Sequence, residues 1–178
     1  ITAPSNFLVG ATGELVNPKK VLSSEQRARL KQAKQSNSPV MITTREESDE
    51  LVASPTEDEK TWKFKADNVR DFAFSASSAF AWDAMGVDVP GRDERVMAMS
   101  MWPIEGDNLW DLYSTHAVAH AIESYSRTAM PYPWPVAWSV NGVVGGGMEY
   151  PMMTFNGPRP EEDGTWTKRA KYGLITVI

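Results

Sequence analysis

Val96-Met97-Ala98-Met99-Ser100-Met101-Trp102 is the stretch of sequence that decides the fold. Its three methionines recur at every second position, and this period places them on one face of a β-strand. Because strand alternation already explains the spacing, we interpret the methionines as strand core and not as a methionine-rich metal site. The stretch therefore predicts a strand whose methionines face a core.

A long helix and further strands are expected after this strand. The helix should run from about Asp107 to Ala129, with Asp107 or Asn108 as its N-cap and with Pro131 and Pro133 ending it. Strand patterns occur at residues 135–140 and 152–155, with a glycine-rich turn or edge at 142–147 between them and a loop at 156–164. This half of the chain thus combines strands with one long helix.

The residues before this unit carry shorter elements. Short strands are expected at 7–9, 14–16, 40–44, 62–64 and 71–76, and in the last of these Phe72 and Phe74 would share one face. Ser23 should open a helix, because Ser23-x-x-Gln26 has the spacing of a capping box, and residues 36–39 should end it. Residues 45–60 carry seven acidic side chains without the Asp/Gly spacing of a calcium loop, so we interpret them as a solvated connecting loop.

An amphipathic helix is expected at residues 165–178. Ala170, Leu174 and Ile178 recur at i, i+4 and i+8, with Val177 beside them, so that one face of the helix is apolar. No Gly, Asn or Pro follows to end it. We therefore expect the helix to continue beyond Ile178, in a longer protein of which this chain is a piece.

The composition is that of a folded protein, and it argues against several classes of partner. Of the 178 residues, 42% are hydrophobic, and a chain of this length can bury a core. The net charge of −5, with no dense Lys/Arg cluster, argues against a nucleic-acid partner. No apolar run approaches the ~20 residues that span a membrane. The absence of cysteine excludes thiolate metal sites, so any metal would use His, Asp or Glu, and it is compatible with an extracytoplasmic location.

His116 and His120 raise the question of a metal site, because two histidines four residues apart lie on one helix face. The hydrolytic H-E-x-x-H motif, however, requires Glu directly after the first His, and this chain has Ala117 there. Leu112 precedes them at helical spacing, so the histidines also fit an extension of an apolar stripe as packed or hydrogen-bonded side chains. A metal-binding protein that uses this pair stays open as an alternative.

Gly145-Gly146-Gly147-Met148-Glu149-Tyr150-Pro151 is the second candidate site. Three consecutive glycines leave the backbone unshielded, which suits a tight bend or the close approach of another peptide. A peptide could add as a strand to such an edge, and Glu149 could bind its α-ammonium group. From the residues alone, a hairpin with a glycine-rich bulge followed by a surface glutamate is the favoured interpretation of the stretch.

Several stretches of the chain resemble one family in the same order. Gly146-Gly147-Met148-Glu149 resembles the start of the G-x-M-E-N exopeptidase motif of aminopeptidase N-like metallopeptidases, the gluzincins with a thermolysin-like catalytic domain. Residues 62–74 are similar to the last strand of that family's N-terminal β-domain, and Tyr132-Pro133-Trp134-Pro135 to its Y-P-[FY]-P turn. Residues 171–178 resemble the helix that runs into H-E-x-x-H.

The resemblance implies an α+β architecture. Residues 1–66 would end an N-terminal β-sandwich domain, and residues 67–178 would form the sheet-bearing N-terminal half of a truncated thermolysin-like catalytic domain. It also implies a zinc cofactor, held by the two His of H-E-x-x-H and a Glu on the next helix, with ligands and general base all outside this chain. The chain therefore contains no catalytic or metal-binding residue of the family, and alone it should be inactive.

The resemblance also implies a peptide substrate and a role for the edge that receives it. Gly146, Gly147 and Met148 would pair with the substrate backbone, and Glu149 would anchor its free amino terminus. Tyr150 stands where the motif usually has Asn, and a phenol cannot reproduce the hydrogen bonds of an amide. Strict aminopeptidase specificity therefore stays open, and the alternative function is a noncatalytic peptide-binding module or pseudoenzyme.

Overall fold

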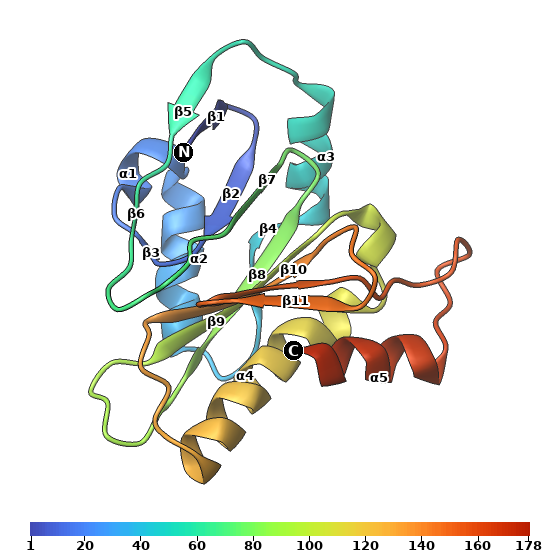
Figure 1. The fold of residues 1–178 in the computed structure, drawn as a ribbon. Coiled ribbons are helices and arrows are strands. Elements are labelled where there is room, and N and C mark those ends of the chain that lie inside the picture. The colour runs from blue at the N-terminus through green and yellow to red at the C-terminus, as the bar shows by residue number, and fades with distance from the viewer.

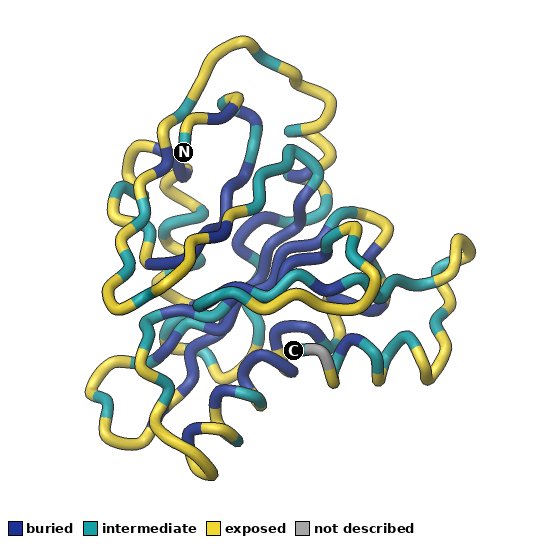
Figure 2. Tube along the Cα trace, viewed as in Figure 1, coloured by how far each residue is buried: buried dark blue, intermediate teal, exposed yellow. Residues whose placement is uncertain are grey.

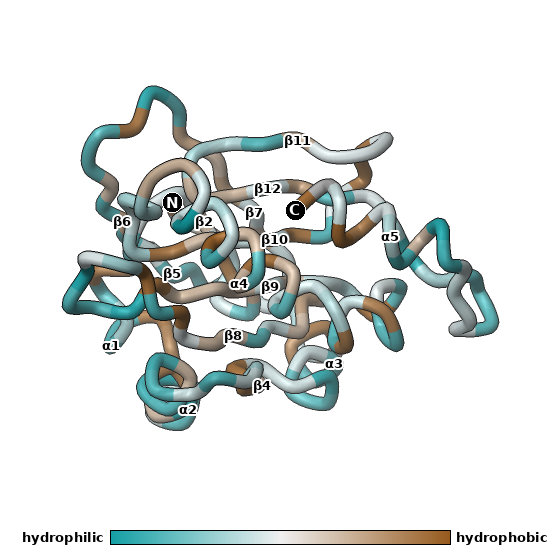
Figure 3. Tube along the Cα trace, turned by 90° about the horizontal axis from the view of Figure 1, so that it is seen from below, coloured by the Kyte–Doolittle hydropathy of each residue, from teal (hydrophilic) through white to brown (hydrophobic). Residues whose placement is uncertain are grey.

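A mixed six-stranded β-sheet organises the computed structural model, which describes residues 1–178 apart from the side chain of Val177. The strand order is β11-β12-β10-β9-β8-β4, and Figure 3 shows these strands one after another. β9, β10 and β12 are parallel, whereas β11, β8 and β4 each pair antiparallel with their neighbours. The strands span Val40–Thr43 (β4), Ala81–Val87 (β8), Val96–Trp102 (β9), Val136–Asn141 (β10), Gly147–Tyr150 (β11) and Met153–Asn156 (β12).

Helices and small sheets cover the two faces of this sheet (Figure 1). One face is covered by α4 (Trp110–Thr128), which also contacts α5 (Lys168–Val177). The other face meets α2 (Ser24–Gln35) and three two-stranded sheets. Those sheets pair β1 (Thr2–Pro4) with β5 (Glu59–Thr61), β2 (Leu8–Ala11) with β7 (Phe74–Ser77), and β3 (Glu14–Leu15) with β6 (Phe64–Lys65); α1 (Pro18–Val21), α3 (Arg45–Ala53) and a 3-10 turn (Ile104–Gly106) complete the described elements.

The methionine-rich stretch is the central strand β9, as predicted. Met99 and Met101 are buried in the core below α2, where Trp138 of β10 also lies. The opposite face of β9 is buried as well, because Ala98 packs in a second core with Val118 of α4. Figure 2 accordingly shows the central strands buried and the surrounding loops exposed. The mixed sheet and five α-helices of the described residues confirm the expected mixture of helix and strand.

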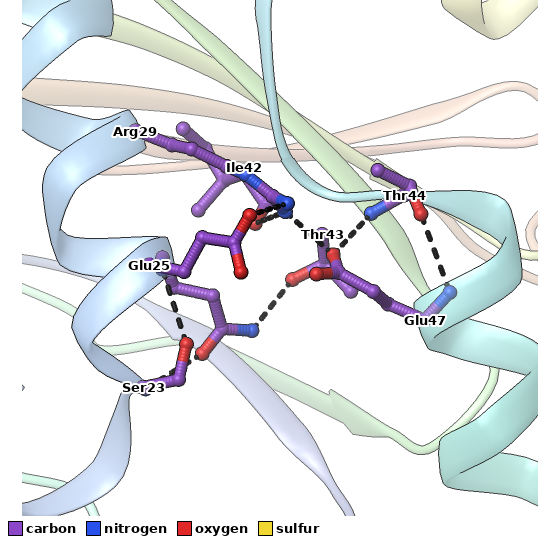
Figure 4. Close-up of polar contacts among 8 residues, drawn as sticks. Ser23, Glu25, Arg29, Ile42, Thr43, Thr44 and Glu47 are labelled. Carbon is purple, nitrogen blue, oxygen red and sulfur yellow. Dashed lines mark hydrogen bonds and ion pairs between the residues drawn. The ribbon is translucent and has the colours of Figure 1, made fainter.

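Two capping boxes fix the starts of α2 and α3, which are both shown in Figure 4. Ser23 and Gln26 exchange hydrogen bonds at the start of α2, so this predicted cap is confirmed. Thr44 and Glu47 exchange hydrogen bonds at the start of α3 in the same way. Arg29 of α2 donates from Nη1 to Oε2 of Glu47 over 2.7 Å and so joins the two helices.

α3 corrects the prediction of a solvated loop at residues 45–60. Arg45–Ala53 is helical, and Ser48 on its inner face is buried. The acidic side chains of Glu46 and Glu47 lie in the first turn, where the helix dipole favours negative charge. The acidic residues from which a loop was predicted therefore stabilise the start of α3.

The start of α4 also differs from the prediction. Neither Asp107 nor Asn108 caps the helix, whose N-cap is Leu109 and lacks a side-chain hydrogen bond. The carboxylate of Asp107 instead accepts from Nε and Nη2 of Arg45, each at 2.9 Å, and from the Trp102 indole at 2.7 Å. A charged partner on α3 thus binds the carboxylate that was expected to cap α4.

Two strand assignments need correction, and one strand pairing connects the two predicted domains. β8 was not predicted at all, because Asp83 and Gly86 interrupt its apolar pattern. Phe72 lies before β7, so Phe72 and Phe74 do not share a strand face, and both side chains are about half exposed. β4, from the first 66 residues, pairs with β8, so the sheet includes residues on both sides of the predicted boundary between 1–66 and 67–178.

The other predicted elements lie close to their observed positions, except that Trp62 and Lys63 of the predicted strand at 62–64 lie between β5 and β6. The loop at 156–164 carries no helix or strand beyond Asn156, and α5 begins at Lys168. Leu174 of α5 is fully buried and Ala170 packs beside it, as the amphipathic pattern predicts, whereas the predicted contribution of Val177 lies outside the described side chains. No helix in the described part of the chain is both long enough and apolar enough to cross a membrane.

Candidate functional site

The candidate site is built on β11, the last strand of the sheet. β11 pairs antiparallel with β12, with Glu149 opposite Thr154 and Gly147 opposite Asn156. Because β11 is terminal in the strand order, its second edge has no strand partner among the described residues. An unpaired edge offers N–H and C=O groups to an extended peptide. Gly147 and Met148 lie in this strand, whereas Gly146, the third residue expected to pair with a peptide, lies in the turn before it.

The glycines before β11 form a tight turn against the residue that follows β12. Gly146 has a φ of 109°, a conformation that side chains disfavour. Its carbonyl oxygen accepts from the backbone N–H of Gly157 at 2.9 Å. A Cβ on Gly157 would collide with the carbonyl oxygen of Val144, so this contact requires glycine. A Cβ on Gly145, in contrast, would meet nothing within 4 Å.

Strand pairing determines which way Glu149 faces. Thr154 lies opposite Glu149 and beside Ser139 of β10, so the three side chains share one face of the sheet. Ser139 Oγ is hydrogen-bonded to Ser114 Oγ of α4 at 3.0 Å. Glu149 therefore lies on the α4 side of the sheet, where α5 also packs.

Tyr150 follows the opposite alternation. Its ring packs edge-on against Phe155 of β12 at a centroid distance of 6.0 Å, and its hydroxyl lies 3.2 Å from Sδ of Met148. Met148 and Tyr150 thus lie on the sheet face that turns away from α4. The residue that departs from the family motif packs on the face opposite to the Glu149 carboxylate.

Glu149 and Tyr150 line a pocket of about 430 Å³. One wall comes from Ile122 of α4 and another from Tyr132 and Trp134, which precede β10. The pocket also contains Ile178, directly after α5, together with Arg70, Asp71 and Pro151. Strand β11 and the C-terminal end of α5 therefore meet at one pocket, although 29 positions separate Glu149 from Ile178 in the sequence.

The Tyr132–Pro135 turn forms a fixed wall of this pocket. Arg92 donates from Nη1 to the carbonyl oxygens of Tyr132 and Pro133, at 3.1 and 2.7 Å. The Tyr132 hydroxyl donates to the carbonyl oxygen of Val136 at 3.0 Å, and its ring packs edge-on against Trp134. Burial raises the pKa of the Tyr132 phenol well above its usual value, so it stays a neutral donor.

His116 and His120 do not take part in this site. Both side chains are exposed on the outer surface of α4, so the interpretation as an extension of the apolar stripe is wrong. His120 Nε2 lies 3.3 Å from Ser124 Oγ, which is its nearest hydrogen-bond partner. The described residues contain no group of three His, Cys, Asp or Glu side chains that could hold a metal ion.

Sequence reasoning missed a chain of buried polar side chains between α4 and the sheet. Each neighbour lies within hydrogen-bond distance of the next, at 2.5 to 3.0 Å. The chain continues to Thr154, opposite Glu149, which lies 3.1 Å from the Asn156 amide. In order from β8 to β12 the chain contains Asp83, Thr115, Ser100, Ser114, Ser139 and Asn156.

Asp83 is the titratable member of this polar chain. Its side chain is 1% exposed, and burial raises its pKa to about 7, with a smaller contribution from the charge of Asp111. The hydroxyl of Thr115 opposes this shift by hydrogen bonding to the carboxylate. A carboxyl with this pKa exchanges its proton near neutral pH. The isolated polar residues within apolar strands, such as Ser100 and Ser139, were the available sequence signal.

Comparisons with known proteins leave the family open: no protein-family model matches the chain, and no curated protein matches it. The resemblance to aminopeptidase N-like metallopeptidases therefore rests on the sequence motifs alone.

Proposed function

We propose that the intact protein is a zinc metallopeptidase of the aminopeptidase N-like kind and that this chain supplies its substrate-docking edge. The observation that carries the proposal is that Glu149 and Ile178 line one pocket. In the family that the sequence resembles, the zinc motif follows the position of Ile178. The end of α5 would thus bring that motif beside the residue proposed to hold the substrate's amino terminus.

The edge strand would hold the substrate through backbone hydrogen bonds. A peptide in extended conformation can pair with the free edge of β11 along Gly147 and Met148. Glu149 lies on the α4 side of this strand and would bind the ammonium group at the end of the peptide through charge-assisted hydrogen bonds. Because Glu149 would bind the ammonium group at a fixed position, it would also determine where the first peptide bond of the substrate lies.

The described residues do not fit a zinc ion, because they contain no group of three potential ligands. The family resemblance implies that the two His of H-E-x-x-H, the general base and the ligand Glu of the next helix lie beyond Ile178. Zinc bound there would lower the pKa of a coordinated water toward neutrality. This chain would bind and orient the substrate.

The finer fold assignment belongs to the same proposal. The mixed sheet with α4 and α5 on one face supports the sheet-bearing half of a thermolysin-like domain. The two-stranded sheets β1-β5 and β3-β6, which lie within residues 1–66, support the end of a β-sandwich domain. In this assignment the remainder of the catalytic domain is the partner that completes the pocket.

The residues encoded after Ile178 test the proposal directly. A peptidase requires H-E-x-x-H within about ten residues, and the purified intact protein should then contain one zinc per chain. If the motif is absent while a free peptide still binds, the noncatalytic peptide-binding module is correct, since the unpaired edge of β11 suffices for strand addition. Absence of both the motif and peptide binding would refute both functions.

A further inference from the structure

A second pocket, of about 570 Å³, lies on the opposite side of the sheet from Glu149. It opens between α2 and the ends of β9 and β10, with β3 and β6 beside it. This volume lies within the ~300–1,000 Å³ of small-molecule sites. Its apolar lining includes Leu15, Phe64, Trp82, Met97, Met99 and Trp138.

The rim of this pocket is basic although the chain is acidic. Six basic and two acidic side chains line it, whereas the whole chain has a net charge of −5. The acidic residues are Glu14 and Glu94, of which Glu94 is paired with a lysine. The basic residues are Lys19, Arg27, Lys31, Lys34, Arg92 and Arg95.

Two of these basic residues are placed to receive an anion together. Arg27 and Lys31 are four positions apart on α2 and therefore lie on one face of the helix. Neither side chain makes an ion pair within the described residues, and Nη1 of Arg27 donates to the carbonyl oxygen of Leu22. The Arg27 guanidinium thus keeps donors for a ligand while one of them fixes its position.

Three residues that line the pocket carry buried N–H groups. Nε1 of Trp82, Nε1 of Trp138 and Nε of Arg92 are buried without a hydrogen-bond partner within the described residues. All three are N–H donors, and none can accept a hydrogen bond. The two indole rings have centroids 5.5 Å apart, are tilted by 37°, and belong to residues that both line the pocket. Because these atoms are shielded from solvent, the sign of the ligand is inferred from the basic rim and not from them.

We propose that this pocket binds a small amphipathic carboxylate, a molecule with one apolar tail and one anionic head. The tail would cover the Trp82 and Trp138 rings, and the carboxylate would be held by Arg27 and Lys31. Burial of the tail supplies the hydrophobic contribution, and the two cations select against a positively charged head. The site differs from the peptide edge proposed above, because Glu149 lies on the other side of the sheet.

Titration of the purified protein with decanoate tests this site, with tryptophan fluorescence and calorimetry as readouts. Decanoate should bind saturably at one site and change the emission of Trp82 and Trp138. Decyltrimethylammonium, which has the same tail and the opposite charge, should bind at least about tenfold more weakly. Equal binding of the two compounds, or no saturable binding of decanoate, would overturn the proposal.

Two sets of variants test the contacts of the carboxylate head and those of the apolar tail separately. Arg27→Gln combined with Lys31→Gln should weaken decanoate binding about tenfold or more, since the charge pair is lost. Lys20→Gln combined with Lys63→Gln removes the same charge from exposed positions outside the pocket and should leave binding unchanged. Equal losses in the two double variants would contradict a specific head site.

Ala28→Trp tests the tail, because Ala28 is exposed on α2 and lines the pocket. The indole should fill the opening and abolish decanoate binding while every rim charge is kept. Circular dichroism checks that the helix survives the change. If Ala28→Trp is folded and binds decanoate as the wild type does, the pocket is not the binding site. If the variant is unfolded, the Arg27 and Lys31 double variant decides the question.

Discussion

The hydroxyl oxygen of Thr115 on α4 lies 2.5 Å from Oδ1 of Asp83 on β8. This contact starts the buried polar chain that ends opposite Glu149, and it joins the helix layer to the middle of the sheet. Because no basic side chain pairs with the Asp83 carboxylate in the described structure, its ionisation is disfavoured by burial. The stability of the fold should therefore depend on the protonation of this residue.

Asp83→Asn should remove a pH dependence of stability. In the unfolded chain the carboxyl ionises at its usual pKa of 3.8, and in the folded chain at about 7. Between these values the folded state binds the extra proton, so stability falls as pH rises through this window. The shift corresponds to roughly 4 kcal/mol as an upper bound, at about 1.4 kcal/mol per pKa unit.

Urea unfolding of wild type and Asp83→Asn from about pH 4 to about pH 8 measures this difference. The variant should lose less stability with rising pH, and Asp111, whose pKa burial also raises, accounts for a residual slope in both proteins. Thr115 can still hydrogen-bond to the amide, so the variant keeps the contact. Parallel stability curves would show that Asp83 titrates alike in the folded and unfolded states.

Asp107→Ala should destabilise the junction of α3, β9 and α4. The carboxylate accepts three hydrogen bonds, two from Arg45 and one from Trp102, and both ionic side chains are mostly buried. Their loss leaves the guanidinium without its anion, at a cost of about 1–3 kcal/mol. The free energy of unfolding in urea measures the loss.

The exposed pair of Lys65 and Asp67 provides the control for this variant. Its atoms are 3.4 Å apart and its side chains are 70% and 77% exposed, so Asp67→Ala should change stability by about 0.5 kcal/mol or less. Similar losses in Asp107→Ala and Asp67→Ala would mean that the geometry around Arg45 adds nothing to an ordinary surface ion pair.

Gly157→Ala should loosen the glycine-rich turn that carries β11. The added methyl group would collide with the carbonyl oxygen of Val144, and relief of this contact costs about 1–3 kcal/mol. Hydrogen exchange at the amides of Met148 and Glu149 should become faster, because the turn no longer holds the strand. Gly145→Ala meets open space and should leave exchange unchanged. Equal exchange in the two variants would exclude a role of Gly157 in holding the edge.

Residue patterns within a short window predicted those helices and strands in which every residue of the window favours the same secondary structure. The alternation of residues 96–102 located β9, and the Ser23 capping box located α2. Residues 45–60 misled because their acidic composition obscured a second capping box, at Thr44 and Glu47, which carries the same information. A composition that suits a loop also suits the first turn of a helix, and only the spacing distinguishes them.

The remaining errors depend on contacts between distant segments. β8 contains Asp83 because Thr115, 32 residues later, supplies a hydrogen bond in the interior. Asp107 fails to cap α4 because Arg45, 62 residues earlier, binds its carboxylate. Neither partner can be recognised from a local window. The edge position of Glu149 could be expected from the sequence, because the glycines before it indicate a turn and the residues after it indicate a strand. Its role as the anchor of a peptide's amino terminus stays a prediction.

Glu149→Gln in the intact protein tests that role most sharply. The carboxylate lines the pocket from an edge strand, and the amide keeps its size and most of its contacts while losing the charge that would hold an ammonium group. Loss of an ion pair in a desolvated site costs about 2–5 kcal/mol, so kcat/KM for free-amine peptides should fall about thirtyfold or more.

Peptides with an acetylated amino terminus should show little difference between variant and wild type, because they carry no ammonium group. Glu162→Gln, at an exposed position outside the pocket, should leave both substrate classes unaffected. Unchanged kcat/KM of Glu149→Gln for free-amine peptides would refute the anchor, and an equal fall for free and acetylated peptides would assign Glu149 to the shape of the edge strand instead of to recognition of the amino terminus.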